Sequence, residues 1–322
     1  MDEIKFFIGP MSKNVVDAII EFYKETGNLV GLIPSRRQVE WDGGYANNWT
    51  TKEFCDYANI LPLQRDHAGP DQGITDDDGY ESLAHDAKSF NLIHIDPWKR
   101  YPDFAEGLKW TASMIEYCNR INSKIVYEIG TEEAIRYFKA SELEKLILAL
   151  KYELMPAVFD KIKYLVIQSG TSLKGTSQAG NYDSERLKDM ITIARKYKLR
   201  SKEHNGDYLP LDLVKEKFNL GLNSINIAPE FGLIETTTYL NEIKDEKLFN
   251  RFWQICYDSK KWVKWVSSSF DPYYNKEQLI RVCGHYVLSQ PDFIQDVKAN
   301  LPELDEKIKA NIKLKLNELY GS

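Results

Sequence analysis

The sequence predicts an α/β fold: one (β/α)₈ TIM barrel followed by an additional C-terminal helical segment. Eight short apolar, β-branched runs recur along the chain, and segments with helical period lie between them. Strands that alternate with helices build parallel sheets. No Gly-x-Gly-x-x-Gly turn follows the first run, so a closed barrel is favoured over an open dinucleotide-binding sheet.

The predicted strands are apolar runs that each end in polar residues, a pattern typical of buried strands in parallel sheets. They cover residues 4–8, 29–33, 60–63, 92–95, 124–129, 164–167, 199–201 and 222–227. Apolar residues with helical spacing follow several of them, for example at 15–23, 105–121 and 143–154. The 322 residues are enough for one such barrel and an extension.

After residue 227 only helices are predicted. The candidates are 232–243, a tryptophan-rich stretch that contains Trp253, Trp262 and Trp265, and an amphipathic run at 304–320. We therefore expect a barrel domain over residues 1–243 and a helical extension over 244–322. Large aromatic side chains need cover, so the extension is expected to pack on the barrel or to lie at a subunit interface of a homo-oligomer.

Composition excludes several classes of function. The 48 acidic residues outnumber the 42 basic ones, giving a net charge of −6, which argues against nucleic acid or an anionic membrane as the partner. We find no apolar stretch long enough to span a bilayer and no signal-peptide pattern at the N-terminus. The four cysteines are far apart and form no Cys-x-x-Cys pair, as expected for reduced thiols in a cytoplasmic protein.

Polar and charged residues follow nearly every predicted strand. In a TIM barrel these positions lie together at the carboxyl end of the strands, where active sites are built. Burying so many ionisable groups costs several kcal/mol per ion unless a metal or a substrate compensates. The pattern therefore predicts an enzyme-like site that binds a small molecule.

Histidine is scarce, and two of the five histidines, His67 and His204, follow predicted strands. With a carboxylate such as Glu128 they would form a three-ligand site with open positions, the pattern of a catalytic divalent metal such as Zn²⁺. His94 lies two residues before Asp96 and shares its face of the strand. It is either a third inward group or a core histidine, and the core interpretation is favoured. The remaining two are expected at the surface or in packing: His85 and His285.

Six short motifs, in order over residues 4–240, resemble the class II tagatose-bisphosphate aldolase accessory-subunit family of the class II aldolase superfamily. The motifs are Gln38-Val39 with Gly43-Gly44-Tyr45, the segment ILPLQRDHAGP at 60–70, IHID at 93–96, YEIGTE at 127–132, Gln168-x-Gly170, and Glu203-His204-x-x-Asp207-Tyr208. The C-terminal third is covered only loosely.

The resemblance implies a metal-dependent barrel enzyme that acts on sugars or sugar phosphates. Asp66 matches the catalytic acid/base aspartate, His67 and His204 match metal ligands, and Glu128 stands where related aldolases place a carboxylate that can reach the metal. Gln168 replaces a histidine of the superfamily's metal site. The loop after the seventh strand lacks the usual glycine- and serine-rich phosphate loop, and its Asp207 would repel a phosphate unless paired.

The candidate site falls into three groups. The catalytic candidates are Asp66 and Glu133, and the candidate metal ligands are His67, Glu128, His204 and Gln168, holding Zn²⁺ or alternatively Mn²⁺ or Co²⁺. Guanidinium groups suit a phosphate or carboxylate, so the basic residues are expected to hold an anionic substrate end. The substrate-binding candidates are Ser35, Arg36, Arg37, Arg65, Asp96, Lys99, Gly170, Asn205, Asp207, Asn226 and Glu230.

Three functions remain open from the sequence. The first is metal-assisted aldol cleavage or condensation of a ketose or ketose phosphate. The second is a metal-dependent sugar epimerase on the same barrel, which needs the same groups. The third is a non-catalytic stabilising subunit of a separate aldolase, which would bind no metal of its own.

Overall fold

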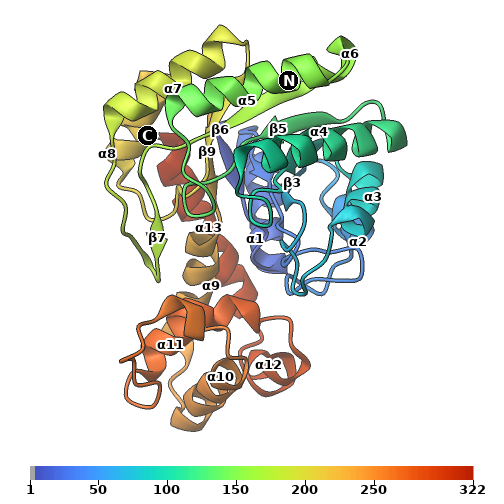
Figure 1. Cartoon of the computed structure of the whole chain (residues 1–322). Helices are drawn as coiled ribbons and strands as arrows, with labels where there is room; N and C mark the ends of the chain where they lie inside the picture. Colours follow the sequence, from blue (N-terminus) through green and yellow to red (C-terminus); the bar gives the residue numbers. More distant parts are fainter. Residues whose placement is uncertain (1–3, 322) are drawn as a thin grey trace.

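Within residues 4–321, the part of the chain described by the computed structural model, eight parallel strands form a nearly closed barrel (Figure 1). Their order is β2-β1-β10-β9-β6-β5-β4-β3. The two end strands meet across the seam, where the amide of Leu32 donates to the carbonyl of Pro62 and the amide of Asp66 to that of Pro34, both at 2.9 Å. The predicted TIM barrel is confirmed.

The barrel strands are short and buried. They are β1 (Phe6–Ile8), β2 (Gly31–Leu32), β3 (Gln64–Ala68), β4 (Leu92–Ile95), β5 (Val126–Ile129), β6 (Ile162–Ile167), β9 (Arg200–Glu203) and β10 (Ser224–Ile227). Seven of them overlap the predicted runs. The third prediction was wrong in register: residues 60–63 precede β3, and Ile60 is exposed. Asp66 and His67 therefore lie in the strand rather than after it.

Helices cover the outside of the barrel. They are α1 (Lys13–Thr26), α2 (Thr51–Tyr57), α3 (Tyr80–Ser89), α4 (Phe104–Ile121), α5 (Ala140–Glu153), α6 (Pro156–Phe159), α7 (Ser184–Lys196), α8 (Leu211–Leu220) and α9 (Pro229–Glu242). Side-chain caps mark several starts: the hydroxyl of Thr50 and the carboxylate of Glu53 form a reciprocal capping box on α2. A small hairpin, β7 (Leu173–Lys174) and β8 (Ser177–Gln178), interrupts the loop after β6 and was not expected from the sequence.

The barrel interior changes from apolar to polar along its axis. An apolar layer fills the amino end and consists of Ile4, Phe7, Ile33, Leu92 and Tyr164. Above it lies the ammonium of Lys202, 3.5 Å from the centre of the Phe7 ring. The apolar layer closes the floor of the barrel, so polar chemistry is confined to its carboxyl end.

The C-terminal third divides into two parts. Residues 246–300, which we call the cap, contain α10 (Glu246–Asp258), α11 (Lys276–Cys283), α12 (Pro291–Asp296) and three short 3₁₀ turns, η1 (Val263–Trp265), η2 (Gly284–Tyr286) and η3 (Lys298–Asn300). The last helix, α13 (Leu304–Gly321), returns to the barrel and packs against α1 and α9. Figure 1 shows the cap as a separate helical group beyond one end of the barrel.

The cap contacts the loops at the carboxyl end of the barrel strands. The amide of Asn47 donates to the hydroxyl of Ser289 at 2.7 Å. The rings of Tyr45 and Tyr286 meet edge to face, with centroids 4.9 Å apart. The cap therefore contacts the end of the barrel where a TIM-barrel active site is expected.

Within residues 4–321, no helix is long and apolar enough to cross a membrane. The four cysteines, all of which lie in this described range, are buried free thiols.

Candidate metal centre and active site

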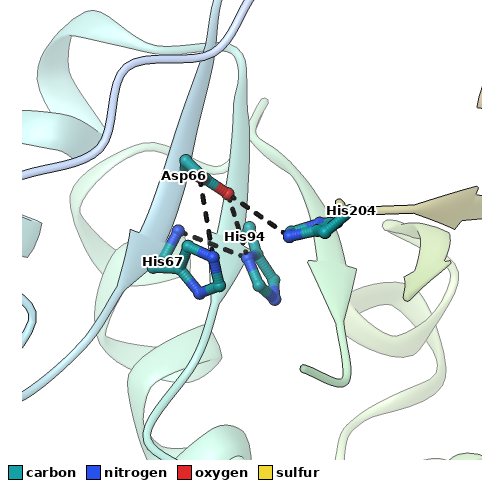
Figure 2. A group of neighbouring side chains, drawn as sticks. All are labelled: Asp66, His67, His94 and His204. Carbon is teal, nitrogen blue, oxygen red and sulfur yellow. Dashed lines mark hydrogen bonds and ion pairs between the residues drawn. The ribbon is translucent and has the colours of Figure 1, made fainter. Parts of the chain in front are cut away.

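Three histidines and one aspartate converge at the carboxyl end of the barrel (Figure 2). Asp66 and His67 come from β3, His94 from β4, and His204 follows β9 directly. One potential ligand atom from each of the four lies within 4.8 Å of those of the others. We call this group the His₃Asp cluster.

A break in the regular strand brings two consecutive residues into the cluster. Neighbouring side chains of a strand point to opposite faces, so Asp66 and His67 could not both face inward in a regular β3. The register of β3 against β4 shifts between Arg65 and Ala68, and His67 has a left-handed backbone with φ 44°. Such a conformation costs a non-glycine residue about 1–2 kcal/mol. Here it turns the His67 ring toward Asp66.

Each imidazole in the cluster has one ring nitrogen held by an acceptor outside it. Nδ1 of His67 lies 2.5 Å from Oδ2 of Asp96. Nε2 of His94 lies 2.9 Å from the carbonyl of Gly130, and Nε2 of His204 lies 2.7 Å from Oε1 of Glu128. When each of these three outward-facing nitrogens carries the ring proton, the second nitrogen of each imidazole presents a lone pair toward the centre of the cluster.

The inward nitrogens surround the carboxylate of Asp66. Nε2 of His67 lies 3.6 Å from Oδ2, while Nδ1 of His94 and Nδ1 of His204 lie 3.6 Å and 3.8 Å from Oδ1. Nδ1 of His94 also lies 3.3 Å from the amide of His67. Oδ1 of Asp66 is buried and has no hydrogen-bond partner among the described residues. A buried carboxylate oxygen without a donor is costly, which fits a position beside a bound cation.

The charges within the cluster shift the pKa values of Asp66 and His67 in opposite directions. Burial opposes ionisation of both Asp66 and His67. The surrounding imidazoles nevertheless hold the pKa of Asp66 well below its ordinary range. Asp66 and Asp96 raise the pKa of His67 to about 10. A proton on His67 would place positive charge next to Asp66, and a divalent cation can supply the same charge.

A buried ion pair lies beneath the cluster and connects to it. Nζ of Lys202 lies 2.8 Å from Oε2 of Glu128, and Gln64 donates to the same oxygen at 2.6 Å. Burial lowers the pKa of Lys202, while Glu128 counteracts the shift. With Asp66 and Asp96, the site has three carboxylates against one ammonium, so neutral imidazoles would leave a surplus of two negative charges.

The donor set and this charge balance fit a divalent metal. Three imidazole nitrogens are ligands that Zn²⁺ and similar ions prefer, and the Asp66 carboxylate beside them can balance part of the metal's charge. Carboxylate or carbonyl acceptors behind the metal-binding histidines are the usual outer partners of such sites. Asp96, Gly130 and Glu128 occupy those positions here.

Two predicted ligands lie outside the cluster. Gln168 makes its hydrogen bonds elsewhere: its amide nitrogen donates to the carbonyls of Thr131 and Arg136, both at 2.8 Å, and its oxygen accepts from the amide of Phe138. Glu128 contacts His204 and Lys202, so it holds the His204 ring from outside the cluster rather than sharing it.

Three other charged candidates are engaged in ion pairs away from the cluster. Arg36 pairs with Glu40 at 2.6 Å and with Asp77. Arg65 is fully buried and pairs with Asp86 at 2.8 Å, because its side chain points outward from β3. Glu133 pairs with Arg186 at 2.7 Å. These ion pairs stabilise the loops and the barrel wall, so the three side chains do not lie in the His₃Asp cluster.

Asp207 and Glu230 organise the start of α9. Oδ1 of Asp207 accepts from the amides of Ala228 and Glu230 at 2.9 Å and 2.7 Å. Burial raises the pKa of Asp207 to about 7. Glu230 accepts from the amide of Tyr208 and pairs with Lys315 of α13, both at 2.7 Å. The helix start that could bind a phosphate is therefore occupied by the chain's own carboxylate.

The remaining candidates are at the barrel mouth. Asn226 points into the barrel, because its neighbours Ile225 and Ile227 belong to the core outside it, and neither atom of its buried amide has a partner among the described residues. Arg37 and Lys99 follow β2 and β4 and lie near each other. Ser35, Gly170 and Asn205 lie in loops after β2, β6 and β9.

Sequence reasoning missed three residues of this site. His94 was favoured as a core histidine, although its alternation with Asp96 was a signal for an inward position. Lys202 alternates with His204 in the same way. Glu132, next to the predicted Glu133, lies near enough to His67 to influence its pKa.

No protein-family model and no curated protein matches this sequence. Solved structures do share its fold. A probable tagatose 6 phosphate kinase from Sinorhizobium meliloti 1021 is 16% identical with a TM-score of 0.77, covering 98% of this chain and 99% of that one. A fructuronate-tagaturonate epimerase from Cohnella laeviribosi is 10% identical with a TM-score of 0.65, covering 98% and 81%.

A third similar structure is a putative fructose-1,6-biphosphate aldolase from Coccidioides immitis, 13% identical with a TM-score of 0.58, covering 98% of this chain and 91% of that one. These likenesses show a common barrel with proteins named as sugar-processing enzymes. At such identities the resemblance to the aldolase accessory-subunit family stays a prediction.

Proposed function

We propose that this protein is a metal-dependent enzyme of the class II aldolase type that makes or cleaves a C–C bond in a ketose or ketose derivative. The observation that carries the proposal is the His₃Asp cluster, in which three imidazoles held from outside direct their other nitrogens toward Asp66. The enzyme names of the structural neighbours support a sugar substrate.

His67, His94 and His204 would hold the metal, with Zn²⁺, Mn²⁺ or Co²⁺ as candidates. A divalent metal bound there would polarise the substrate carbonyl and stabilise the negative charge that develops on it. Asp96, Gly130 and Glu128 fix the orientation of the three rings.

Asp66 is the residue assigned to proton transfer. Its buried Oδ1 has no hydrogen-bond donor among residues 4–321, so it is an acceptor available for the proton of a substrate hydroxyl during cleavage and can return that proton during condensation. The unpartnered amide of Asn226 can donate to and accept from further hydroxyls.

A metal-dependent epimerase is the second candidate, because one structural neighbour is named as an epimerase of sugar acids. Cleavage, rotation of a fragment and re-closure would use the same cluster. Product analysis separates the two: fragments indicate an aldolase, and a stereoisomer indicates an epimerase.

The test combines elemental analysis of the purified chain with a screen of ketoses, ketose phosphates and sugar acids. The reverse direction is assayed with dihydroxyacetone phosphate and simple aldehydes. We expect about one divalent metal per chain, activity that disappears in chelator, and a Tm that falls when the metal is removed. A metal-free protein whose stability does not respond to chelator would contradict both catalytic proposals and favour a non-catalytic subunit.

A further inference from the structure

A cavity of about 770 Å³ lies between the cap and the loops that follow β2 and β3. Positive charge dominates its lining: Arg37 comes from the barrel loop, and Lys260, Lys261 and Lys264 come from the cap, against Asp42. Tyr45 and Tyr286 form part of its wall. Cavities with a few convergent charged groups are typical ligand sites.

The cavity lining holds more cations than carboxylates. Among the described residues, no carboxylate lies within 4 Å of the charged atoms of Arg37, Lys261 or Lys264. Nε of Arg37 donates to the carbonyl of Gly73 at 3.1 Å, which leaves its two terminal nitrogens for a ligand. Arg36, the adjacent arginine, is by contrast held by two carboxylates.

Arg37, Lys261 and Lys264 line the same cavity, so their charges repel one another. Partial desolvation and the nearby cations Arg37, Lys261 and Lys99 lower the pKa of Lys264 to about 8. Its ammonium lies 5.1 Å from the centre of the Tyr286 ring. A bound anion would relieve this repulsion and could accept both the ammonium and the forked guanidinium.

A short chain of contacts connects the cavity to the His₃Asp cluster. Arg37 bonds to Gly73, and the adjacent Gln72 lies 3.4 Å from Oδ2 of Asp96. That oxygen holds Nδ1 of His67. The start of α9 is closed to an anion by Asp207, so the cavity is the better place for the charged end of a substrate.

We propose that Arg37 and the cap residue Lys264 form an anion subsite, which holds a phosphate or carboxylate on the substrate end remote from the metal. The cap then contributes to substrate specificity. This inference rests on the proposed function, because it assumes a substrate bound at the metal. Anion binding at the cavity can nevertheless be measured without turnover.

The metal-loaded full chain is titrated with inorganic phosphate and, separately, with acetate. NMR measures the affinity of the chain for each anion. Metal content is measured on the same samples. The variants are Lys264→Ala, the charge-conserving Lys264→Arg, and Lys188→Ala as a matched control, because Lys188 is an exposed lysine on α7 that pairs with Glu185.

We expect wild type and Lys188→Ala to bind at least one anion equally well. Lys264→Ala should bind it about tenfold more weakly, and Lys264→Arg should restore most of the affinity. Tighter binding of phosphate would indicate a phosphate ester as the substrate class, and tighter binding of acetate would indicate a sugar acid. Either outcome supports the subsite. Failure to bind both anions, or equal binding by Lys264→Ala, would overturn it.

The two proposals fail separately. A chain that binds metal but shows no anion binding sensitive to Lys264 loses only the subsite. A chain that binds anions through Lys264 but holds no metal keeps the subsite and loses the proposed metal-dependent activity.

Discussion

Nε2 of His204 lies 2.7 Å from Oε1 of Glu128, and this contact determines which ring nitrogen of His204 faces Asp66. The carboxylate is itself held anionic: burial opposes its charge, but Lys202 and His204 lower its pKa well below the ordinary value. The pair therefore connects a buried barrel lysine to the proposed metal ligand.

Glu128→Gln should weaken metal binding by about 10- to 100-fold. The amide is neutral, can donate to Nε2 of His204 and thereby favours the tautomer whose proton faces the metal site, and it leaves Lys202 without a carboxylate. Competition with a chelator measures the metal dissociation constant. Glu133→Gln is the matched control, because Glu133 pairs with Arg186 outside the cluster. Unchanged affinity in Glu128→Gln would contradict the assigned tautomer.

His94→Ala and Gln168→Ala distinguish the ligand set proposed from the His₃Asp cluster from the one predicted by sequence. Loss of the His94 imidazole removes a ligand, so we expect the purified variant to contain little metal. Gln168→Ala should keep its metal but lose about 1–3 kcal/mol of folding stability, because it leaves buried backbone groups unpaired. Elemental analysis and urea unfolding measure the two effects. A metal-free Gln168→Ala beside a fully loaded His94→Ala would reverse the assignment.

Asp66→Asn should lower turnover by roughly 10²- to 10⁴-fold while metal remains bound through the three histidines. The amide cannot accept a proton from a substrate hydroxyl at neutral pH. Turnover of the identified substrate and metal content are measured together. Asp56→Asn, on the exposed face of α2, is the control. Near-wild-type turnover would show that another group transfers the proton, and loss of metal would show that Asp66 is an essential ligand.

His285→Phe should make folding less sensitive to acid. His285 is buried against Tyr45 and Tyr286, and desolvation, followed by repulsion from Lys264, lowers its pKa from 6.5 to about 3. The unfolded chain takes up this proton first, so the stability that a neutral His285 contributes is present above about pH 6.5 and is lost as pH falls toward 3.

Between pH 6.5 and pH 5 this one group should cost wild type about 2 kcal/mol. Urea midpoints at pH 7.5 and pH 5 measure the change for wild type, His285→Phe and the control His85→Phe, whose histidine lies on α3 beside Trp41. The difference between the urea midpoints at pH 7.5 and pH 5 should become smaller in His285→Phe only. An equal decrease in all three proteins would show that other groups cause the acid sensitivity.

Local patterns were sufficient to predict the barrel and part of its site. The periodicity of apolar residues and the runs of β-branched residues are local signals, so they can be read from neighbouring residues alone. Seven of the eight runs predicted from them overlap barrel strands. The placement of His67 and His204 near strand ends followed from the same reasoning. The third strand was misplaced because β3 is largely polar, QRDHA, and carries no apolar signal.

The identity of the cluster depended on contacts between distant parts of the chain. The bulge in β3 decides that Asp66 and His67 both face inward, and the pairing of β4 beside it places His94 within reach. Whether Gln168 or Arg65 faces the site depends on which partners surround each side chain. Strand position alone does not specify those partners.

By itself, the sequence determined an α/β barrel with helical additions and a polar, histidine-bearing carboxyl end, because strand and helix periods are local properties of the chain. Only the tertiary structure decided that His94 joins the cluster, that Glu128 supports His204 from behind, and that Lys264 of the cap lies near Arg37. The physical reason is that ligand geometry and charge balance arise from residues up to 227 positions apart, which only the closed barrel and its cap bring together.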